Sequence, residues 1–310
     1  MSRMPKISVA VPLYNKGAYI DETVKSALSQ TFSDFEIIVV DDGSTDDGVS
    51  KVSNLGDSRI VVVTQDNAGA AAARNRALHE AQAPFVAFLD ADDIWFPDHL
   101  LHLTNLSQRF PAVALFGNGF VEARAGERPP PPLENVEYRL LGNYFSECAF
   151  SREPFFTSSC MVRRERALEL GGFPVGNFCG EDLALWIRIA ACDQVAISDY
   201  IGCWYRRQPD SLSFQPSYRN APDISMAALE ELLRAESSMS APRKRIVQEY
   251  YFRIALAHSL DCLIAGEVEA AKKFLQLSAE TQAFRSRWRQ ATLLAWTPKP
   301  VRDLIFRLRR

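Results

Sequence analysis

The chain has 310 residues and a mass of 34.8 kDa, enough for one large α/β domain with an appendage or for two modest domains. Apolar residues make up 47% and charged residues 24%, so the composition is globular and excludes an intrinsically disordered protein. The formal net charge of −3 argues against a nucleic-acid-binding protein that depends on overall positive charge.

The cysteines and the N-terminal segment indicate a reducing compartment. Six cysteines are spread along the chain without a Cys-x-x-Cys pair. The N-terminus lacks the apolar run and small-residue cleavage site of a signal peptide, and no stretch approaches the ~18 consecutive apolar residues of a spanning helix. We therefore expect a cytoplasmic protein whose thiols are reduced and mostly buried.

Short apolar runs alternate with helical patterns in the first part of the chain. Strands are predicted over residues 7–11, 37–40, 60–63, 85–89 and 112–116, and helices over residues 19–30, 70–82 and 98–109. Such alternation is typical of an α/β fold with a mostly parallel sheet covered by helices on both faces. In these sheets, ligands bind at the carboxyl ends of the strands.

The pattern changes after residue 118. Residues 122–135 are polar and proline-rich and predict a surface loop, and a helix is expected around residues 182–192. Helical spacing then dominates over residues 222–235, 242–264 and 267–281. We expect two halves of one domain, 1–118 and 119–215, followed by a helical extension over 216–310.

The C-terminal end is strongly basic. Residues 284–310 contain eight basic residues and the single acid Asp303, so this segment carries a charge of +7 and the remainder −10. Tryptophans and leucines are mixed with the arginines, and Pro298 and Pro300 divide the segment in two. A basic amphipathic segment of this kind is typical of contact with an anionic membrane surface. A helix packed on the rest of the protein, or a solvated terminus, is the alternative.

Polar motifs follow three of the predicted strands. They are Pro12-Leu13-Tyr14-Asn15, Asp41-Asp42-Gly43-Ser44 and Asp90-Ala91-Asp92-Asp93. Carboxylates that meet at one rim repel one another unless a cation or hydrogen-bond donors neutralise them. Asp-x-Asp spacing suits Mg²⁺ or Mn²⁺, which keeps substrate phosphates among its remaining ligands. Taken singly, Asp-Asp-Gly-Ser more often forms a turn, and Asp-x-Asp after a strand is as consistent with a helix cap as with a ligand set, but together they predict a site for a metal-chelated diphosphate.

These motifs resemble those of family 2 glycosyltransferases with the GT-A fold. The resemblance rests on VAVPLYNKGAYIDETVKSALSQTF, EIIVVDDGSTD, NAGAAAARNRAL and FVAFLDADDIW in this order, and on the later segments SSCMVRRERALELGGF and GEDLALWIRI. It covers roughly residues 5–210. It implies a nucleotide-diphospho-sugar transferase that inverts the configuration of the sugar as it transfers it to an acceptor hydroxyl.

The resemblance also implies a donor site. Tyr14 would stack on the nucleobase, and Asp42, with Asp41 close by, would accept the N3–H of uracil or thymine. Asp90 would contact the ribose and Asp92 the metal. The full set expected to bind the nucleotide sugar is Pro12, Tyr14, Asn15, Asp41, Asp42, Asn67, Arg74, Asp90 and Ala91. Three alternatives stay open: Tyr14 as a core aromatic, Arg74 as a salt-bridge partner of a rim carboxylate, and Asp93 as either a supporting residue or an exposed neighbour.

The acceptor side is implied by the Glu181-Asp182 pair. In the family this acidic pair opens a helix, which implies that Asp182 is the general base and that Glu181 lies beside it. Capping of the helix by the same acids is the alternative. Trp186, Trp204 and Tyr205 are candidates for an acceptor platform, although each is also a candidate for the core. Arg206 and Arg207 follow where the family often carries basic residues near the diphosphate.

The sequence thus predicts a glycosyltransferase that depends on Mn²⁺ or Mg²⁺ and uses a UDP-sugar, with dTDP-sugars and GDP-sugars left open. The expected acceptor is a lipid-linked or surface glycan of bacterial polysaccharide biosynthesis, reached from the inner face of the membrane. Two alternatives remain. A haloacid-dehalogenase-type phosphatase would use the Asp90/Asp92 pair, but its nucleophile belongs on the first strand. A non-catalytic sugar-nucleotide-binding scaffold would not need the acids.

Overall fold

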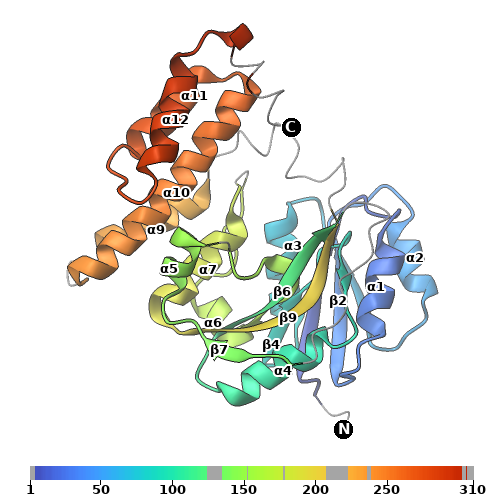
Figure 1. Ribbon diagram of the computed structural model, residues 1–310. Helices are drawn as coiled ribbons and strands as arrows, with labels where there is room; N and C mark the ends of the chain where they lie inside the picture. Colours follow the sequence, from blue (N-terminus) through green and yellow to red (C-terminus); the bar gives the residue numbers. More distant parts are fainter. Residues whose placement is uncertain are drawn as a thin grey trace. The chain divides into compact units, whose positions relative to one another are not determined.

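The computed structural model describes residues 4–123, 135–151, 153–176, 179–206, 223–235, 239–301 and 305. The chain divides into two compact units (Figure 1). The first comprises Met1–Tyr144 and Glu153–Ser225, and the second comprises Phe145–Arg152 and Met226–Arg310. The helical part therefore differs from the expected 216–310 segment, because it starts later and includes a short segment from the middle of the chain.

Within the described residues, the first unit contains a nine-stranded sheet. Its parallel part has the order β3 (Ile60–Thr64), β2 (Phe35–Asp41), β1 (Ile7–Leu13) and β4 (Phe85–Phe88). The register places Val9 beside Ile37 on one side and beside Ala87 on the other. These four strands confirm the parallel sheet that the alternating pattern predicts.

The sheet continues beyond β4 with mixed strand directions. The order there is β8 (Cys160–Arg163), β6 (Leu115–Ala123), β9 (Val195–Arg206) and β5 (Ile94–Trp95), with β7 (Tyr138–Leu140) paired to β9 outside this path. β8 is antiparallel to both β4 and β6. The sheet as a whole is mostly parallel but not purely so, and β8 lies between the two parallel parts.

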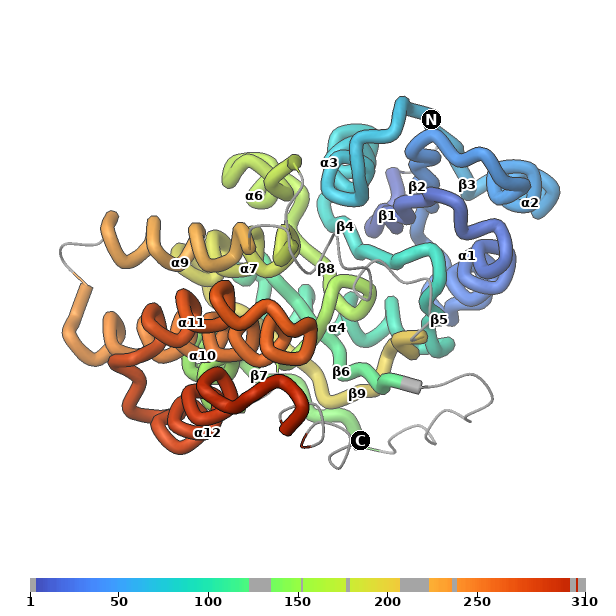
Figure 2. Tube along the Cα trace, turned by 90° about the horizontal axis from the view of Figure 1, so that it is seen from above, coloured from blue at the N-terminus to red at the C-terminus, as the bar shows by residue number. Residues whose placement is uncertain are grey.

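Helices cover both faces of the parallel strands. They are α1 (Ile20–Leu28), α2 (Gly48–Asn54) and α3 (Ala70–Glu80), whereas α4 (His99–Arg109) packs against β6 and β9. Figure 2 shows α1 and α3 on opposite sides of β1 and β2. Because successive strand residues face opposite sides, a strand covered in this way is apolar throughout. Accordingly, six of the seven residues of β1 are buried, and Val9 and Val11 pack in one core cluster with Ile20 and Val24 of α1.

Several short elements were not predicted from the sequence. In the second half of the first unit these include α6 (Arg164–Glu169) and the 3₁₀ turn η1 (Thr157–Ser159), which precede α7 (Glu181–Cys192). The helix α5 (Tyr144–Phe150) lies mostly in the second unit. Elements of three to seven residues contain too little periodic pattern to be recognised, and their structure depends on the strands and helices they pack against.

The second unit is helical. It contains α9 (Ile224–Ala235), α10 (Ala241–Ala265), α11 (Val268–Leu277) and α12 (Arg285–Trp296). Gly266 ends α10 at a φ of +88°, a conformation that favours glycine, and the chain turns back into α11. A core of Leu256, Leu263, Ala271, Leu275, Ala291, Leu294 and Ala295 joins α10, α11 and α12, which lie side by side in both views (Figures 1 and 2).

Within the basic C-terminal segment, residues 302–304 and 306–310 lie outside the described residues. In the part of the chain that the structure describes, no helix combines the length and the apolar character needed to cross a bilayer. All six cysteines have free thiols, and four of them are buried.

One histidine of the first unit is buried in its neutral form. His99 of α4 is fully buried, and its ring packs against Trp95 at a tilt of 32°, with ring centroids 4.5 Å apart. Its Nδ1 lies 3.1 Å from the amide nitrogen of Asn118, and its Nε2 has no hydrogen-bond partner. Gly202 allows this close packing, because a Cβ at that position would lie 2.2 Å from the same Nδ1. Burial, with a smaller effect from His102, lowers the pKa of His99 from 6.5 to about 3.

This burial predicts a loss of stability in mild acid. The unfolded chain binds a proton to His99 below pH 6.5, whereas the folded chain does so only near pH 3, so the free energy of unfolding falls as pH decreases between these values. At pH 5 the expected loss is about 2 kcal/mol. Urea unfolding of wild type and His99→Gln at pH 7.5 and pH 5 measures this, with the wild type losing more stability than the variant. Equal losses in the two proteins would contradict the assignment.

Candidate active site

The carboxyl end of β1 presents an accessible aromatic ring. Tyr14 directly follows the strand and is 49% exposed, which rules out the core alternative for this residue. Asn15 has a φ of +50°, and its side-chain oxygen accepts a hydrogen bond from the backbone N–H of Thr45 at 2.8 Å. Its own backbone N–H donates to Ser44 Oγ at 3.1 Å. The loop after β1 is thereby fixed to the loop after β2.

The acidic pair at the end of β2 is buried. Asp41 is 4% exposed and Asp42 is 2% exposed. Oδ1 of Asp42 accepts hydrogen bonds from Gln65 Nε2 at 2.8 Å and from the Ala68 N–H at 2.9 Å, and Oδ2 accepts one from the Gly69 N–H at 2.8 Å. Asp42 thus holds the loop that leads into α3. Its expected contact with a base stays a prediction.

The two carboxylates of the Asp-x-Asp motif each contact a cation. Asp90 Oδ1 lies 2.7 Å from Arg74 NH2, and Asp92 Oδ2 lies 3.0 Å from Lys16 Nζ. The Asp92 side chain is 15% exposed. Burial, together with the nearby charge of Asp90, raises the pKa of Asp92, whereas Lys16 acts in the opposite direction. The rim therefore holds carboxylates whose ionised form depends on nearby positive charge.

Asp93 is a supporting residue and not an exposed neighbour. Its side chain is fully buried, and Oδ2 accepts a hydrogen bond from Ser158 Oγ at 2.6 Å. Oδ1 accepts one from the backbone N–H of Arg206 at 3.0 Å. Ser158 Oγ in turn accepts the backbone N–H of Asp90 at 3.0 Å. Two segments far away in sequence thus hold the loop that contains Asp90 and Asp92.

The side chain of Arg206 also contacts the Asp90–Asp93 loop. Its Nε donates to the carbonyl oxygen of Asp92, NH1 pairs with Glu22, and NH2 donates to Thr23 Oγ1 at 3.3 Å. Its guanidinium group is therefore engaged with the protein in this structure, although the sequence placed it near a diphosphate. Arg207 lies outside the described residues.

Arg74 connects the Asp-x-Asp motif to the later acidic pair. Its NH2 contacts Asp90, and its NH1 lies 3.1 Å from Glu181 Oε1 at the start of α7. Burial acts to lower the pKa of Arg74, but the carboxylates of Asp90, Glu181 and Asp182 outweigh it and raise that pKa. The salt-bridge alternative left open for Arg74 is thus realised in this structure, and its contact with a nucleotide stays a prediction.

Asp182 lies beside this pair and has different partners. Its Oδ2 accepts a hydrogen bond from Thr157 Oγ1 at 2.6 Å, and its Oδ1 accepts one from the backbone N–H of Leu183 at 2.7 Å. Burial, followed by the charge of Asp182, raises the pKa of Glu181 despite its pairing with Arg74. Glu181 is therefore paired with Arg74, whereas Asp182 faces the η1 turn.

The aromatic residues proposed for the acceptor differ in exposure. Trp186 is 1% exposed and lies among Phe88 and Phe173, with ring centroids 5.9 and 5.7 Å away. A ring enclosed in this way has no open face, so the expectation that Trp186 stacks on an acceptor is wrong, and Trp186 belongs to the core. Trp204 and Tyr205 are partly exposed on β9, and their role stays a prediction.

The remaining donor-site candidates lie around the same rim. Asn67 is exposed in the loop before α3, and Pro12 is partly buried on β1. Ala91 is 4% exposed, and its carbonyl oxygen accepts a hydrogen bond from Thr23 Oγ1 at 2.9 Å. Ala91 thus contributes mainly through its backbone, which helps to hold the loop between the two acids.

The oxygen ligands that Asp90 and Asp92 offer fit a hard divalent cation. Asp90 and Asp92 supply carboxylate oxygens, which Mg²⁺ and Mn²⁺ prefer, and the ammonium group of Lys16 already lies at hydrogen-bond distance from Asp92. The position beside Asp92 therefore accommodates positive charge.

Sequence reasoning did not identify three residues that contact the carboxylates. Lys16 directly follows the Tyr-Asn motif, and its position in the loop after the first strand was the available signal. Ser158 opens the segment SSCMVRRERALELGGF that carries part of the family resemblance, but neither it nor Thr157, which precedes that segment, was named as a candidate site residue. Only the antiparallel pairing of β8 with β4, which places Met161 beside Ala87, brings their hydroxyl groups to this rim.

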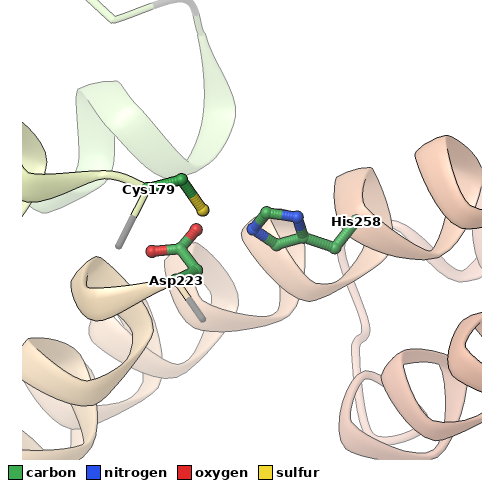
Figure 3. Close-up of side chains that lie close together, drawn as sticks. All are labelled: Cys179, Asp223 and His258. Carbon is green, nitrogen blue, oxygen red and sulfur yellow. The ribbon is translucent and has the colours of Figure 1, made fainter. Parts of the chain in front are cut away.

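A cysteine precedes the acidic pair. Cys179 forms a backbone bridge with Asp223, and Figure 3 shows its thiol turned toward the carboxylate of that residue. Burial, followed by the charge of Asp223, raises the pKa of Cys179 to about 12, so the thiol is protonated and is not a nucleophile at neutral pH. Figure 3 also labels His258, which stacks on Phe274 within the second unit at a centroid distance of 5.1 Å.

Comparison with known proteins places this geometry in a family. Residues 8–171 match the model of glycosyl transferase family 2. The chain is 37% identical over 215 residues to the Escherichia coli UDP-Glc:alpha-D-GlcNAc-diphosphoundecaprenol beta-1,3-glucosyltransferase WfaP, covering 68% of this chain and 80% of WfaP. It is 38% identical over 218 residues to the Rhizobium meliloti succinoglycan biosynthesis protein ExoW, covering 61% of this chain and 67% of ExoW.

Other relatives are much longer than the matched region. The chain is 32% identical to a glycosyltransferase of Rickettsia conorii and 29% identical to one of Rickettsia felis, and it spans 31% of the length of each.

Solved structures share the fold. S. aureus TarS 1–349, determined with UDP-GlcNAc, gives a TM-score of 0.67 at 20% identity, covering 88% of this chain and 81% of TarS 1–349. The Pyrobaculum calidifontis mannosyltransferase PcManGT, determined with GDP-Man and Mn²⁺, gives a TM-score of 0.62 at 20% identity, covering 98% of this chain and 84% of that one. These likenesses confirm the expected GT-A-like α/β fold. Since the family model covers more than half of the chain, the protein belongs to the family 2 glycosyltransferases.

Proposed function

We propose that this glycosyltransferase moves a sugar from a UDP-sugar to a hydroxyl group of a lipid-linked or surface glycan in bacterial polysaccharide biosynthesis, with inversion at the anomeric carbon. The observation that carries the proposal is the pair of ionic contacts of Arg74, at 2.7 Å to Asp90 and 3.1 Å to Glu181. Through them, the acidic motif expected to hold the donor and the acidic pair expected to activate the acceptor lie on either side of one buried guanidinium group.

The accessible ring of Tyr14 supports a nucleotide at the rim. A half-exposed aromatic at the carboxyl end of a parallel strand provides a face on which a flat base can stack while water is excluded from one side. The choice of UDP rests on relatives: WfaP is named as a UDP-Glc transferase, and TarS was determined with UDP-GlcNAc. A carboxylate that accepts a hydrogen bond from the base, such as that of Asp42 or Asp41, favours bases with an N3–H, and uracil is one of these.

Asp92 is proposed as the protein ligand of a divalent metal, with Asp90 beside it. A bound Mg²⁺ or Mn²⁺ would neutralise the negative charge that develops on the departing diphosphate. Lys16 would leave Asp92 when the metal binds and would lie within reach of the donor phosphates. The guanidinium group of Arg74 holds Asp90 in place throughout, because burial and its second contact to Glu181 fix its position.

Asp182 is proposed as the general base. It would take the proton of the acceptor hydroxyl as that oxygen attacks the anomeric carbon from the side opposite the diphosphate. Glu181 is less suited to this role because it is paired with Arg74. The acceptor class rests on the name of WfaP, whose acceptor is GlcNAc-diphosphoundecaprenol.

Among the residues that the structure describes, no contact at the site favours either of the two alternative functions. A phosphatase of the haloacid dehalogenase type needs a free nucleophilic carboxylate, whereas Asp90 is ion-paired and follows β4, which lies beyond the first strand in sequence. A non-catalytic scaffold has no use for Asp182 in addition to the donor-side acids.

Asp182→Asn removes the proposed base while preserving the shape of the side chain. We expect a drop in kcat of ~10²–10⁴-fold with little change in donor affinity, because a positioned base acts on the acceptor and not on the nucleotide. Transfer of radiolabelled glucose or N-acetylglucosamine from its UDP-sugar to a polyprenyl-diphosphate-linked sugar measures kcat, and calorimetric titration with UDP measures binding.

Asp193→Asn is the matched control. Asp193 lies at the other end of α7 and pairs with Arg166 at 2.7 Å, so this variant makes the same change on the same helix away from the acidic pair. Its kcat should stay within about twofold of wild type. A kcat for Asp182→Asn that also stays within this range would contradict the role of Asp182.

The helix α12 is proposed as the site of contact with an anionic membrane. Arg285, Arg289, Leu293 and Trp296 follow one another at spacings of four, four and three residues, which places them on one face of the helix. Leu293 is 71% exposed and Trp296 is 74% exposed. The opposite face packs into the core of the second unit, and the sequence of α12 contains no acidic residue. Basic residues followed by an exposed tryptophan suit the interface of an anionic bilayer.

Vesicle binding tests this surface. Wild type should co-sediment with vesicles that contain phosphatidylglycerol and not with vesicles of phosphatidylcholine alone. The double substitution Arg285→Gln and Arg289→Gln should weaken binding roughly 30-fold, because each basic residue near the surface contributes ~1 kcal/mol. The control replaces Lys25 and Arg76 of the first unit by Gln and should bind as wild type does. Equal binding by both double variants would contradict the proposed surface.

A further inference from the structure

Three consecutive residues of the η1 turn, Thr157, Ser158 and Ser159, have buried hydroxyl groups, and the turn lies in space beside the two acidic motifs. Thr157 is 3% exposed, and Ser158 and Ser159 are fully buried. The turn directly precedes β8, which pairs with β4 in the antiparallel direction, so its residues lie at the end of β4 where the Asp-x-Asp loop begins. Each hydroxyl has different hydrogen-bond partners, so substituting the three residues one at a time tests each contact separately.

Ser158 holds the donor-side loop at two points. Its Oγ donates to Asp93 Oδ2 at 2.6 Å and accepts the backbone N–H of Asp90 at 3.0 Å. Its carbonyl oxygen also accepts the indole N–H of Trp95 at 2.6 Å. The hydroxyl thus joins the first and last residues of the Asp90–Asp93 loop, and the two carboxylates proposed to contact the donor and the metal lie within that loop.

Thr157 holds the acceptor side. Its Oγ1 donates to Asp182 Oδ2 at 2.6 Å. A hydrogen bond from a buried hydroxyl to a carboxylate restricts the rotation of that carboxylate. The other oxygen of Asp182, Oδ1, accepts the backbone N–H of Leu183, so both oxygens are held in place. Since Thr157 and Ser158 are adjacent, their backbones fix the separation between the donor-side loop and Asp182.

We propose that Thr157 and Ser158 are positioning residues that hold the two acidic motifs of the active site in register, with Thr157 acting on Asp182 and Ser158 acting on the Asp90–Asp93 loop. This inference rests on the proposed function, because it assigns the loop to the metal and donor and Asp182 to the acceptor. Asp93 helps Ser158 to position this loop, because its buried carboxylate accepts hydrogen bonds from the Ser158 hydroxyl and from the Arg206 N–H.

Ser159 provides a matched control within the same turn. Its hydroxyl donates to the carbonyl oxygen of Phe156 at 3.1 Å and accepts the Phe156 N–H at 3.0 Å. Ser158→Ala and Ser159→Ala therefore each remove two hydrogen bonds from a fully buried serine. Both variants should lose thermal stability, but only Ser158→Ala releases the donor-side loop.

The experiment measures metal affinity and catalysis separately. Electron paramagnetic resonance of free Mn²⁺ gives the Kd of the metal in the presence of UDP, and transfer assays give kcat and KM. Ser158→Ala should weaken Mn²⁺ binding by about 10–100-fold, the usual effect of losing a group that orients a metal ligand. Thr157→Val should lower kcat by about tenfold or more while the Mn²⁺ affinity stays within about twofold of wild type. Ser159→Ala should change neither.

A variant with an intermediate effect separates the loss of these hydrogen bonds from a general loss of folding. Ser158→Cys keeps the size of the side chain and a weak donor, so its Mn²⁺ affinity should lie between those of wild type and Ser158→Ala. Equal Mn²⁺ affinities for Ser158→Ala and Ser159→Ala would overturn this inference. A Thr157→Val variant whose Mn²⁺ affinity falls by the same factor as its kcat would also overturn it. Either result would leave the proposed function intact. Wild type that binds no UDP with Mn²⁺ would overturn both.

Discussion

The proposed active site depends on one buried cation between two groups of carboxylates. Arg74 contacts Asp90 and Glu181, and the charges of these acids keep its guanidinium group protonated in spite of burial. Without it, acids from the end of β4 and the start of α7 would face each other across a poorly solvated space, which is strongly unfavourable. Breaking such a pair on one side leaves an uncompensated buried charge, so the two motifs are coupled energetically as well as in space.

The sheet supplies the geometry that this coupling needs. The parallel strands bring the loops after β1, β2 and β4 to one rim, as expected for an α/β fold. The antiparallel strand β8 then extends the sheet beyond β4, and the η1 turn in front of it brings Thr157 and Ser158 to the same rim. The two acidic motifs, proposed to contact the donor and the acceptor, are therefore held by ion pairs through Arg74 and by the hydroxyl groups of η1.

The sequence was sufficient for the parts of the fold and site that local pattern determines. The parallel strands, the flanking helices and the rim carboxylates follow from alternating apolar runs that end in polar motifs. What each carboxylate contacts could not be predicted, because the partners come from distant segments: Asp93 meets Ser158 and Arg206, and Asp182 meets Thr157. Trp186 was misassigned for a related reason, since an amphipathic helix pattern does not reveal that Phe88 and Phe173 enclose its ring.

The most direct test of this account is calorimetric titration of UDP, dTDP and GDP into wild type and Asp92→Asn, each with and without Mn²⁺. The account predicts that wild type binds UDP, that Mn²⁺ strengthens this binding, and that Asp92→Asn loses the effect of the metal. No binding of any nucleotide by wild type would contradict the donor site. UDP binding that is equally strong with and without Mn²⁺ and unchanged in Asp92→Asn would contradict the role given to the Asp-x-Asp loop.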